Sequence, residues 1–168
     1  MNHTPSSFTP ATAGQPVIEG TDDREPVAVT APVLREYPPM DLPGNAGAVN
    51  RARVNARTAL TVLGWRGDVH AATEVLAQLV DNAVRHGLTP GAGQRITVRL
   101  AIREPHRLVI DVEDPNPAFP AFAEALQGER GGRGLREVQR LKADVTWFHR
   151  PDAGKTIRAT MVPGAVEP

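Results

Sequence analysis

Three polar side chains recur at one-turn spacing between residues 74 and 82, where they could hold a metal ion or accept a proton. Glu74, Gln78 and Asn82 are four residues apart in series, so on a helix they form one polar stripe. Apolar residues at the spacing of a buried helical face lie beside this stripe: Leu76, Leu79, Val80, Ala83 and Val84. An amide oxygen such as that of Asn82 suits a hard cation that otherwise keeps water ligands. The alternative interpretation is a solvated stripe on an ordinary amphipathic helix.

A carboxylate ends a candidate strand further along the chain. Residues 95 to 103 alternate between apolar and polar types, and a turn at Glu104-Pro-His106 leads into residues 107 to 114. Because strand side chains alternate between faces, Asp114 continues the apolar row of Leu108, Ile110 and Val112. A carboxylate there is costly unless a group such as the amino group of adenine donates to it. The alternative, which is compatible, is that Asp114 begins the turn Asp114-Pro-Asn-Pro117.

A glycine-rich stretch precedes a candidate helix. Gly128-Glu-Arg-Gly-Gly-Arg-Gly134 runs into a segment with apolar residues at helical spacing, beginning at Leu135. Glycines let backbone amides approach an anion closely, and a helix N-terminus adds partial positive charge. Arg130, Arg133 and Arg136 add further positive charge. This pattern indicates a phosphate-binding loop; the alternative is a flexible surface loop before a helix.

A Walker-type phosphate loop is excluded. Gly154-Lys-Thr156 ends like one, but His149 stands where its first glycine would be. The pattern that follows Thr156 is also that of a strand and not of a helix.

The hydrophobic patterning predicts helices and strands in an order typical of a two-layer α+β sandwich, a mixed and mostly antiparallel sheet with helices on one face. We expect a strand at 34–37, a Pro-rich link at 38–44, and helices at 48–63 and 68–86. Strands at 95–103 and 107–114 follow, then a segment at 115–132 with a short helix at 121–126. A helix at 133–142 and a hairpin of 144–149 with 155–162 complete the domain. Trp65 is expected to cap the hydrophobic layer.

Composition limits the classes of protein. Half of the 16 prolines lie in residues 1–44, which carry two Arg against six acidic residues and have no apolar period. We therefore expect a disordered leader at 1–33, one domain at 34–162 and a tail at 163–168. The absence of cysteine excludes a disulfide framework and Cys-ligated metals, which agrees with a cytoplasmic location. Seventeen Arg against two Lys suggest a GC-rich bacterial gene. The sequence has no basic stripe with interleaved aromatics and no apolar run of membrane-spanning length, so it predicts neither nucleic-acid nor membrane binding.

The order of these motifs resembles the GHKL (Bergerat-fold) ATP-binding domains over residues 34–162, most closely the bacterial anti-sigma-factor serine kinases and related stand-alone regulatory ATPases. The resemblance implies ATP and Mg²⁺ as cofactors, with Asn82 as the metal ligand and Asp114 as the acceptor of adenine's amino group. It implies that the glycine loop closes over the phosphates as a lid. The implied ATP-binding residues of the lid and the last strands are Gly131, Gly132, Arg133, Gly134, Leu135 and Thr156.

The sequence departs from that family at the position of the general base. The kinases of the family carry Glu four residues before the magnesium Asn, and this chain has Gln78. An amide cannot accept the proton, and general-base assistance is worth about a hundred- to ten-thousandfold. Glu74 lies roughly 12 Å from Asn82 along a helix axis against roughly 6 Å for Gln78, so it cannot simply substitute. A second departure is Asp114-Pro-Asn-Pro117 in place of the Asp-x-Gly-x-Gly of many family members. Short Asp-Pro-x-Pro versions are typical of the stand-alone regulators, so this departure limits the resemblance to that branch of the family.

Three functions follow from these observations. The favoured one is an ATP-binding regulator of a partner protein, a sigma factor or an anti-sigma antagonist, without efficient phosphoryl transfer. The second is a working serine/threonine kinase that tolerates Gln78, because phosphoryl transfer depends mainly on positioning and charge. The third is an interaction module that binds no nucleotide. The resemblance also allows a homodimer.

Overall fold

The computed structural model describes residues 31–119, 122–127 and 133–164. Most of the expected leader and part of the expected tail therefore lie outside the described residues. In the part of the chain that is described, no helix combines the length and the apolar character needed to cross a membrane.

One sheet of six strands forms the framework of the domain. Its order is β1-β3-β4-β6-β5, with β2 also paired to β3, and every described pairing is antiparallel. The strands are β1 (Val33–Glu36), β2 (Met40–Pro43), β3 (Arg95–Arg103), β4 (Arg107–Asp114), β5 (Asp144–His149) and β6 (Lys155–Met161). β3 and β4 have the predicted bounds; burial alternates along all of β3, and in β4 it alternates from Ile110 to Asp114.

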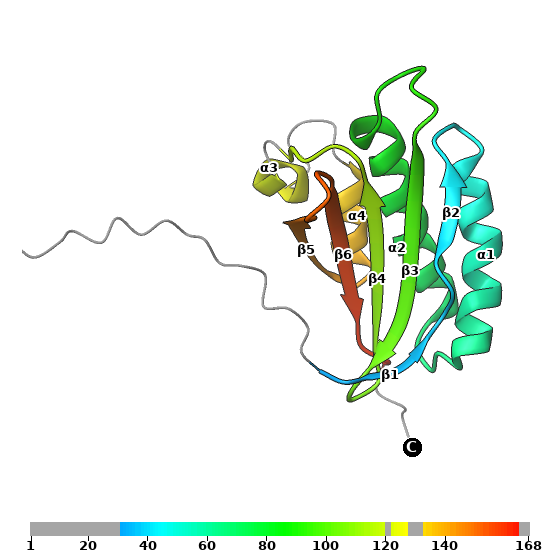
Figure 1. Cartoon of the computed structure of the whole chain (residues 1–168). Helices are drawn as coiled ribbons and strands as arrows, with labels where there is room; N and C mark the ends of the chain where they lie inside the picture. Colours follow the sequence, from blue (N-terminus) through cyan, green and yellow to red (C-terminus); the bar gives the residue numbers. More distant parts are fainter. Residues whose placement is uncertain (1–30, 120–121, 128–132, 165–168) are drawn as a thin grey trace, which may run out of the picture.

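Three helices, α1, α2 and α4, lie against one face of the sheet (Figure 1). The helices are α1 (Ala48–Leu63), α2 (Val69–Asn82), α3 (Phe122–Gln127) and α4 (Arg133–Arg140), and a π-helical turn, η1 (Ala83–Gly87), continues α2. Between the two layers lies one core that includes Leu60, Leu76, Leu79, Ile110 and Ile157, all at most 1% exposed. Trp65 joins this core, as predicted. The predicted α+β sandwich with helices on one face is confirmed.

The predicted link at 38–44 was wrong, because it contains β2. Met40, Asp41 and Leu42 pair with Val98, Thr97 and Ile96 of β3. β1 pairs with the other end of β3, so β1 and β2 together form one interrupted edge. Prolines are tolerated at such an edge because one side of it needs no ladder hydrogen bonds.

The helix ends explain the remaining boundaries. Asp68 caps α2 by accepting a hydrogen bond from the amide of Ala71, and Gly64 ends α1 in the left-handed conformation. α4 ends two residues earlier than predicted, at Arg140, and Lys142 just beyond it has a φ of 62°.

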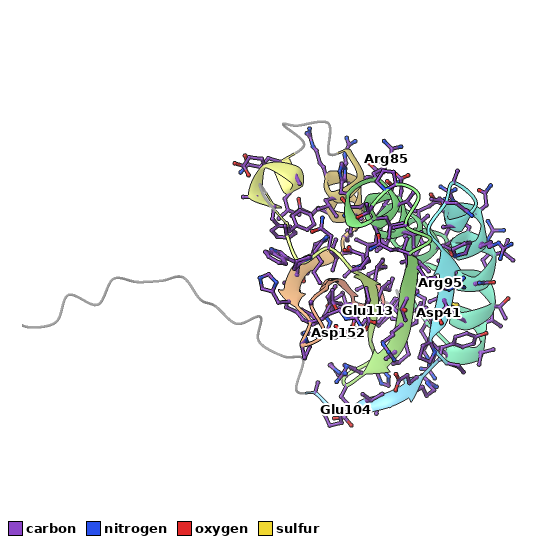
Figure 2. All side chains as sticks on the ribbon, turned by 45° about the horizontal axis from the view of Figure 1, so that its top comes forward. Asp41, Arg85, Arg95, Glu104, Glu113 and Asp152 are labelled. Atoms are coloured by element: carbon purple, nitrogen blue, oxygen red, sulfur yellow. The ribbon has the colours of Figure 1, made fainter. Side chains whose placement is uncertain are left out.

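The outer face of the sheet carries cross-strand ion pairs. Arg99 of β3 pairs with Glu113 of β4 at 2.9 Å, and Arg158 of β6 pairs with Asp111 of β4 at 2.7 Å. Figure 2 shows Asp41, Arg95 and Glu113 over the strands. Because these side chains point away from the helices, the inner face alone buries the core and the candidate site.

An ion pair joins the first two helices. Arg53 of α1 donates to both carboxylate oxygens of Glu74 on α2, at 3.0 and 3.1 Å. The hydrogen bond from Arg53 lowers the pKa of the Glu74 carboxyl, and burial opposes this effect. A carboxyl whose pKa is lowered by folding stabilises the fold above its unfolded pKa, and the contribution disappears as the pH falls through the folded pKa.

We therefore expect Glu74→Gln to reduce the free energy of unfolding by roughly 1 kcal/mol at pH 7, the upper end for a partly exposed pair. The difference from the natural protein should shrink below about pH 4.3, where glutamate ordinarily protonates. Urea unfolding at pH 7 and pH 3 measures this. Glu36→Gln on the exposed β1 is the control; an equal loss at both pH values would contradict the assignment.

Candidate functional site

Asp114 lies at the end of the inner apolar row of β4 and is 1% exposed, as its position in the sequence predicted. Its Oδ1 accepts two hydrogen bonds, from the backbone amide of Asn116 and from Lys155 Nζ, both at 2.9 Å. Its Oδ2 is buried and has no hydrogen-bond partner among the described residues. A buried carboxylate oxygen without a donor is costly, so this atom is suited to a donor from a ligand.

Lys155 is the counterion of Asp114 and is itself 1% exposed. It stands directly across from Asp114 in the β4–β6 ladder. Its ammonium group also donates to the carbonyl of Asn116 at 3.0 Å and lies 5.6 Å from the centre of the Phe119 ring. Lys155 was not among the predicted site residues, although strand alternation from Ile157 and Ala159 places it on the inner face.

The ionisation of Asp114 is set by opposing effects. Burial raises the pKa of the carboxyl above its ordinary value, and this effect outweighs the others. The hydrogen bond and charge of Lys155, the amide of Asn116 and the charge of Arg150 lower the pKa. The carboxylate therefore depends on Lys155 to remain charged in its buried position.

The π-helical turn η1, which follows Asn82 at the end of α2, packs against Asp114 through Gly87. A methyl group built at Gly87 would lie 2.4 Å from Asp114 Cγ and 2.6 Å from Oδ2, so only glycine allows this approach. The carbonyl of His86 accepts a hydrogen bond from Asn116 Nδ2 at 2.9 Å. Local π-helical turns are frequent at functional sites, and this one connects two of the predicted motifs.

Asn82 is the last residue of α2 and is partly buried. Its side-chain nitrogen is buried and has no hydrogen-bond partner within the described residues. Rotation of the amide exchanges its oxygen and nitrogen, so this side chain can offer either a metal ligand or a donor.

Gln78 lies one turn before Asn82 and approaches the start of α4. A methyl group built at Gly134 would lie 3.3 Å from Gln78 Oε1. Gln78 therefore faces the glycine-rich end of α4, whereas Glu74 is bound to Arg53 of α1. The only carboxylate among Glu74, Gln78 and Asn82 is thus directed to another helix.

The structure describes only part of the predicted glycine loop. Gly131 and Gly132 lie outside the described residues, and Arg133 begins α4. Leu135 is 1% exposed and packs in the core.

Thr156 is not brought against the Asp114 side chain. It pairs with Glu113 of β4 in the ladder, one residue away from the Asp114–Lys155 pair. Strand alternation therefore directs Thr156 to the opposite face of the sheet from Asp114. Lys155 occupies the position beside the carboxylate.

A polar depression of about 140 Å³ lies behind this site, on the outer face of the sheet. It is lined by Arg95, Thr97, Glu113, Arg150 and Asp152, and Asp114 also contributes to its wall. Arg150 pairs with Glu113 and Asp152 there. Because these charges neutralise one another, we do not assign the candidate site to this depression.

The described residues fit a magnesium-bound nucleotide better than a metal held by protein alone. No group of three or more His, Cys, Asp or Glu among them could hold a metal ion. Mg²⁺ commonly uses one protein ligand together with waters and phosphate oxygens, and Asn82 could supply that ligand. Asp114 Oδ2 offers the acceptor that an adenine amino group requires.

A family of known proteins matches most of the domain. Residues 67–164 match the family described as histidine kinase-, DNA gyrase B- and HSP90-like ATPases. No curated protein matches the sequence significantly.

Solved structures share the fold at low sequence identity. The RsbU and RsbW domains of a Mycobacterium tuberculosis protein align with a TM-score of 0.51 and 19% identity, covering 78% of this chain and 35% of that one. The SiaB–SiaC complex from Pseudomonas aeruginosa aligns with a TM-score of 0.47 and 16% identity, covering 77% and 91%. This chain thus spans about a third of the Mycobacterium chain, and that similarity concerns the fold alone.

The close approach of Gly87 to Asp114 predicts a steric effect on stability. Gly87→Ala should lower the free energy of unfolding by about 1–3 kcal/mol, the usual cost of overpacking. Chemical denaturation measures this, and Gly164→Ala, in open space, should have no effect. If the carboxylate is the obstacle, Gly87→Ala should cost less in an Asp114→Ala background. An equal cost in both backgrounds would contradict the contact.

Proposed function

Because the chain belongs to the family of histidine kinase-, DNA gyrase B- and HSP90-like ATPases, we propose that it binds ATP with Mg²⁺ and regulates a partner protein through its nucleotide state. The proposed site lies between α2, η1 and the inner face of the sheet. The glycine-rich segment before α4 would cover the phosphates.

The observation that carries this proposal is the pair of buried, unpartnered polar atoms at the site. Among the described residues, Asp114 Oδ2 and Asn82 Nδ2 both lack hydrogen-bond partners. The Gly87 approach connects the elements that carry them, because η1 follows Asn82 directly and contacts Asp114. Buried polar groups are nearly always satisfied, so both atoms are expected to find their partners in a ligand.

Each residue has a distinct role in the proposed complex. Asp114 accepts the hydrogen bond of the adenine amino group through Oδ2. Asn82 ligates Mg²⁺ through its amide oxygen, and the cation neutralises phosphate charge when bound. Gly131, Gly132, Arg133 and Gly134 form the lid, where backbone amides and the start of α4 favour an anion, and Leu135 anchors this end of α4 in the core.

Gln78 favours regulation by binding over regulation by phosphorylation. Its amide faces Gly134, at the end of α4 that would approach the phosphates, but it cannot accept a proton. Glu74 is held by Arg53 and cannot replace it. On this basis the chain retains ATP, and its bound and free states differ in their affinity for a sigma factor or an anti-sigma antagonist.

A serine/threonine kinase is the second candidate function. Gln78 is positioned where it could orient a substrate hydroxyl by hydrogen bonding, and phosphoryl transfer relies mainly on positioning and charge stabilisation. Turnover measurements distinguish the two functions.

We expect the purified protein to bind ATP or ADP in a magnesium-dependent manner. Asn82→Ala should remove the magnesium dependence, and Asp114→Ala should remove the preference for adenine. Calorimetry with and without millimolar magnesium measures both effects. Asn50→Ala, on the exposed side of α1, is the control and should bind normally. Absence of nucleotide binding by the natural protein would favour an interaction module that binds no nucleotide.

We expect the natural protein to turn over ATP slowly because it lacks a carboxylate at residue 78. Gln78→Glu is nearly isosteric and should raise hydrolysis or transfer by up to about a hundred- to ten-thousandfold. Single-turnover loss of γ-phosphate, with and without a partner protein, measures this. Gln139→Glu makes the same chemical change at an exposed site of α4 and should have no effect. Brisk turnover by the natural protein, unchanged in Gln78→Glu, would instead support the kinase.

A further inference from the structure

The side chain of Lys155 is buried, although its place at the end of a strand would allow it to reach solvent. The residue is 1% exposed. Within the described part of the chain, its hydrogen bonds go to Asp114 and to the carbonyl of Asn116 just beyond it. Replacing a buried ion pair by apolar residues is often neutral or stabilising, so a contribution to stability is a poor explanation for this lysine.

The contacts divide the two oxygens of Asp114 into different roles. Oδ1 is saturated by Lys155 and by the amide of Asn116. Oδ2 is left without a partner in the described part of the chain and packs against Gly87, where a methyl group would lie 2.6 Å from it. The side chain therefore has one saturated oxygen and one oxygen that can still accept a hydrogen bond from a ligand.

We propose that Lys155 determines purine selectivity at this site by holding Asp114 ionised and oriented, so that Oδ2 is an acceptor that carries no proton. This inference rests on the proposed function. Adenine presents an amino donor at the position where guanine presents a carbonyl acceptor. An ionised Oδ2 accepts from adenine and repels the guanine carbonyl, whereas a protonated carboxyl could donate to guanine. Lys155 is thus a positioning residue that acts through Asp114.

The charges around Asp114 support this role for Lys155. Lys155 faces the carboxylate from β6, and Arg150 acts on it from the β5–β6 turn. Arg150 is itself paired with Glu113 and Asp152 on the outer face. From η1, Gly87 contacts the carboxylate, and the adjacent His86 is exposed and uses its backbone carbonyl to hold Asn116. Lys155 is therefore the cation that contacts Asp114 directly within the described residues.

The test is the ratio of the GTP and ATP dissociation constants between pH 6 and 8.5, measured by calorimetry with magnesium. Protonation of the phosphates cancels in this ratio. The natural protein should prefer ATP by a constant factor. Lys155→Met should weaken ATP binding at pH 6 by about ten- to hundredfold, the factor typical of a hydrogen bond to a charged group. Its preference for ATP should return as the pH rises and Asp114 loses its proton.

Two further variants separate charge from shape. Lys155→Gln keeps a hydrogen-bond donor without the charge, so it should destabilise the fold less than Lys155→Met and still show pH-dependent selectivity. It also carries the test if Lys155→Met does not fold. Lys142→Met removes the other lysine of the chain, which is exposed, and should leave the ratio unchanged.

A nucleotide-free measurement separates this inference from the proposed function. The carboxyl carbon of Asp114, followed by NMR, should titrate at higher pH in Lys155→Gln and Lys155→Met than in the natural protein. An unchanged titration, or a constant ATP preference in both variants, would overturn the role of Lys155. Absence of ATP and GTP binding by the natural protein, together with a shifted titration, would refute the ATP site and, with it, purine selectivity, while confirming the control of Asp114 ionisation.

Discussion

A carboxylate buried at the end of the inner strand row is the constraint on which the site depends. Asp114 occupies a position where its strand would otherwise continue an apolar row, and a charge there is costly without compensation. The surrounding chain supplies that compensation. Lys155 of β6 and the backbone amide of Asn116, in the turn after β4, both donate hydrogen bonds to Asp114. Because residues 87 and 154 are glycines, their two backbone segments can pack closely against Asp114. Elements distant in the sequence thus converge on one side chain.

The sequence predicted the elements whose patterning is long and uninterrupted. β3, β4 and α1 have the predicted bounds because they are nine, eight and sixteen residues long and most of each follows one period. β2 was missed because its four residues lie among prolines. Its strand conformation comes from pairing with β3, which a local pattern does not encode. The π-helical form of η1 was equally hidden, since its residues read as a continuation of α2.

Part of the candidate site is visible in the sequence as local patterns. Asn82 ends a polar stripe beside an apolar helical face and Asp114 ends an apolar row, but this spacing alone also fits a solvated stripe and a turn. The roles of both residues were predicted from the order of the motifs and the family resemblance that it carries. Lys155 and Gly87 act through cross-strand pairing and close backbone approach, which depend on the assembled fold. Alternation along β6 does carry a signal for Lys155, because a lysine in phase with Ile157 and Ala159 must be buried or bend away. The same alternation directs Thr156 to the opposite face.

Glu74 is the one carboxylate of the polar stripe, and its position affects whether the proposed site would hold a nucleotide or hydrolyse it. Glu74 is neutralised by Arg53, so Gln78 and Asn82 present only amides beside the start of α4. A carboxylate at residue 78 would supply a base but would also repel a nearby triphosphate, since like charges disfavour each other most where water is partly excluded. An amide removes both effects together. The wall formed by α2 is therefore better suited to retaining a bound nucleotide than to cleaving it, which is the property that a binding-state regulator needs.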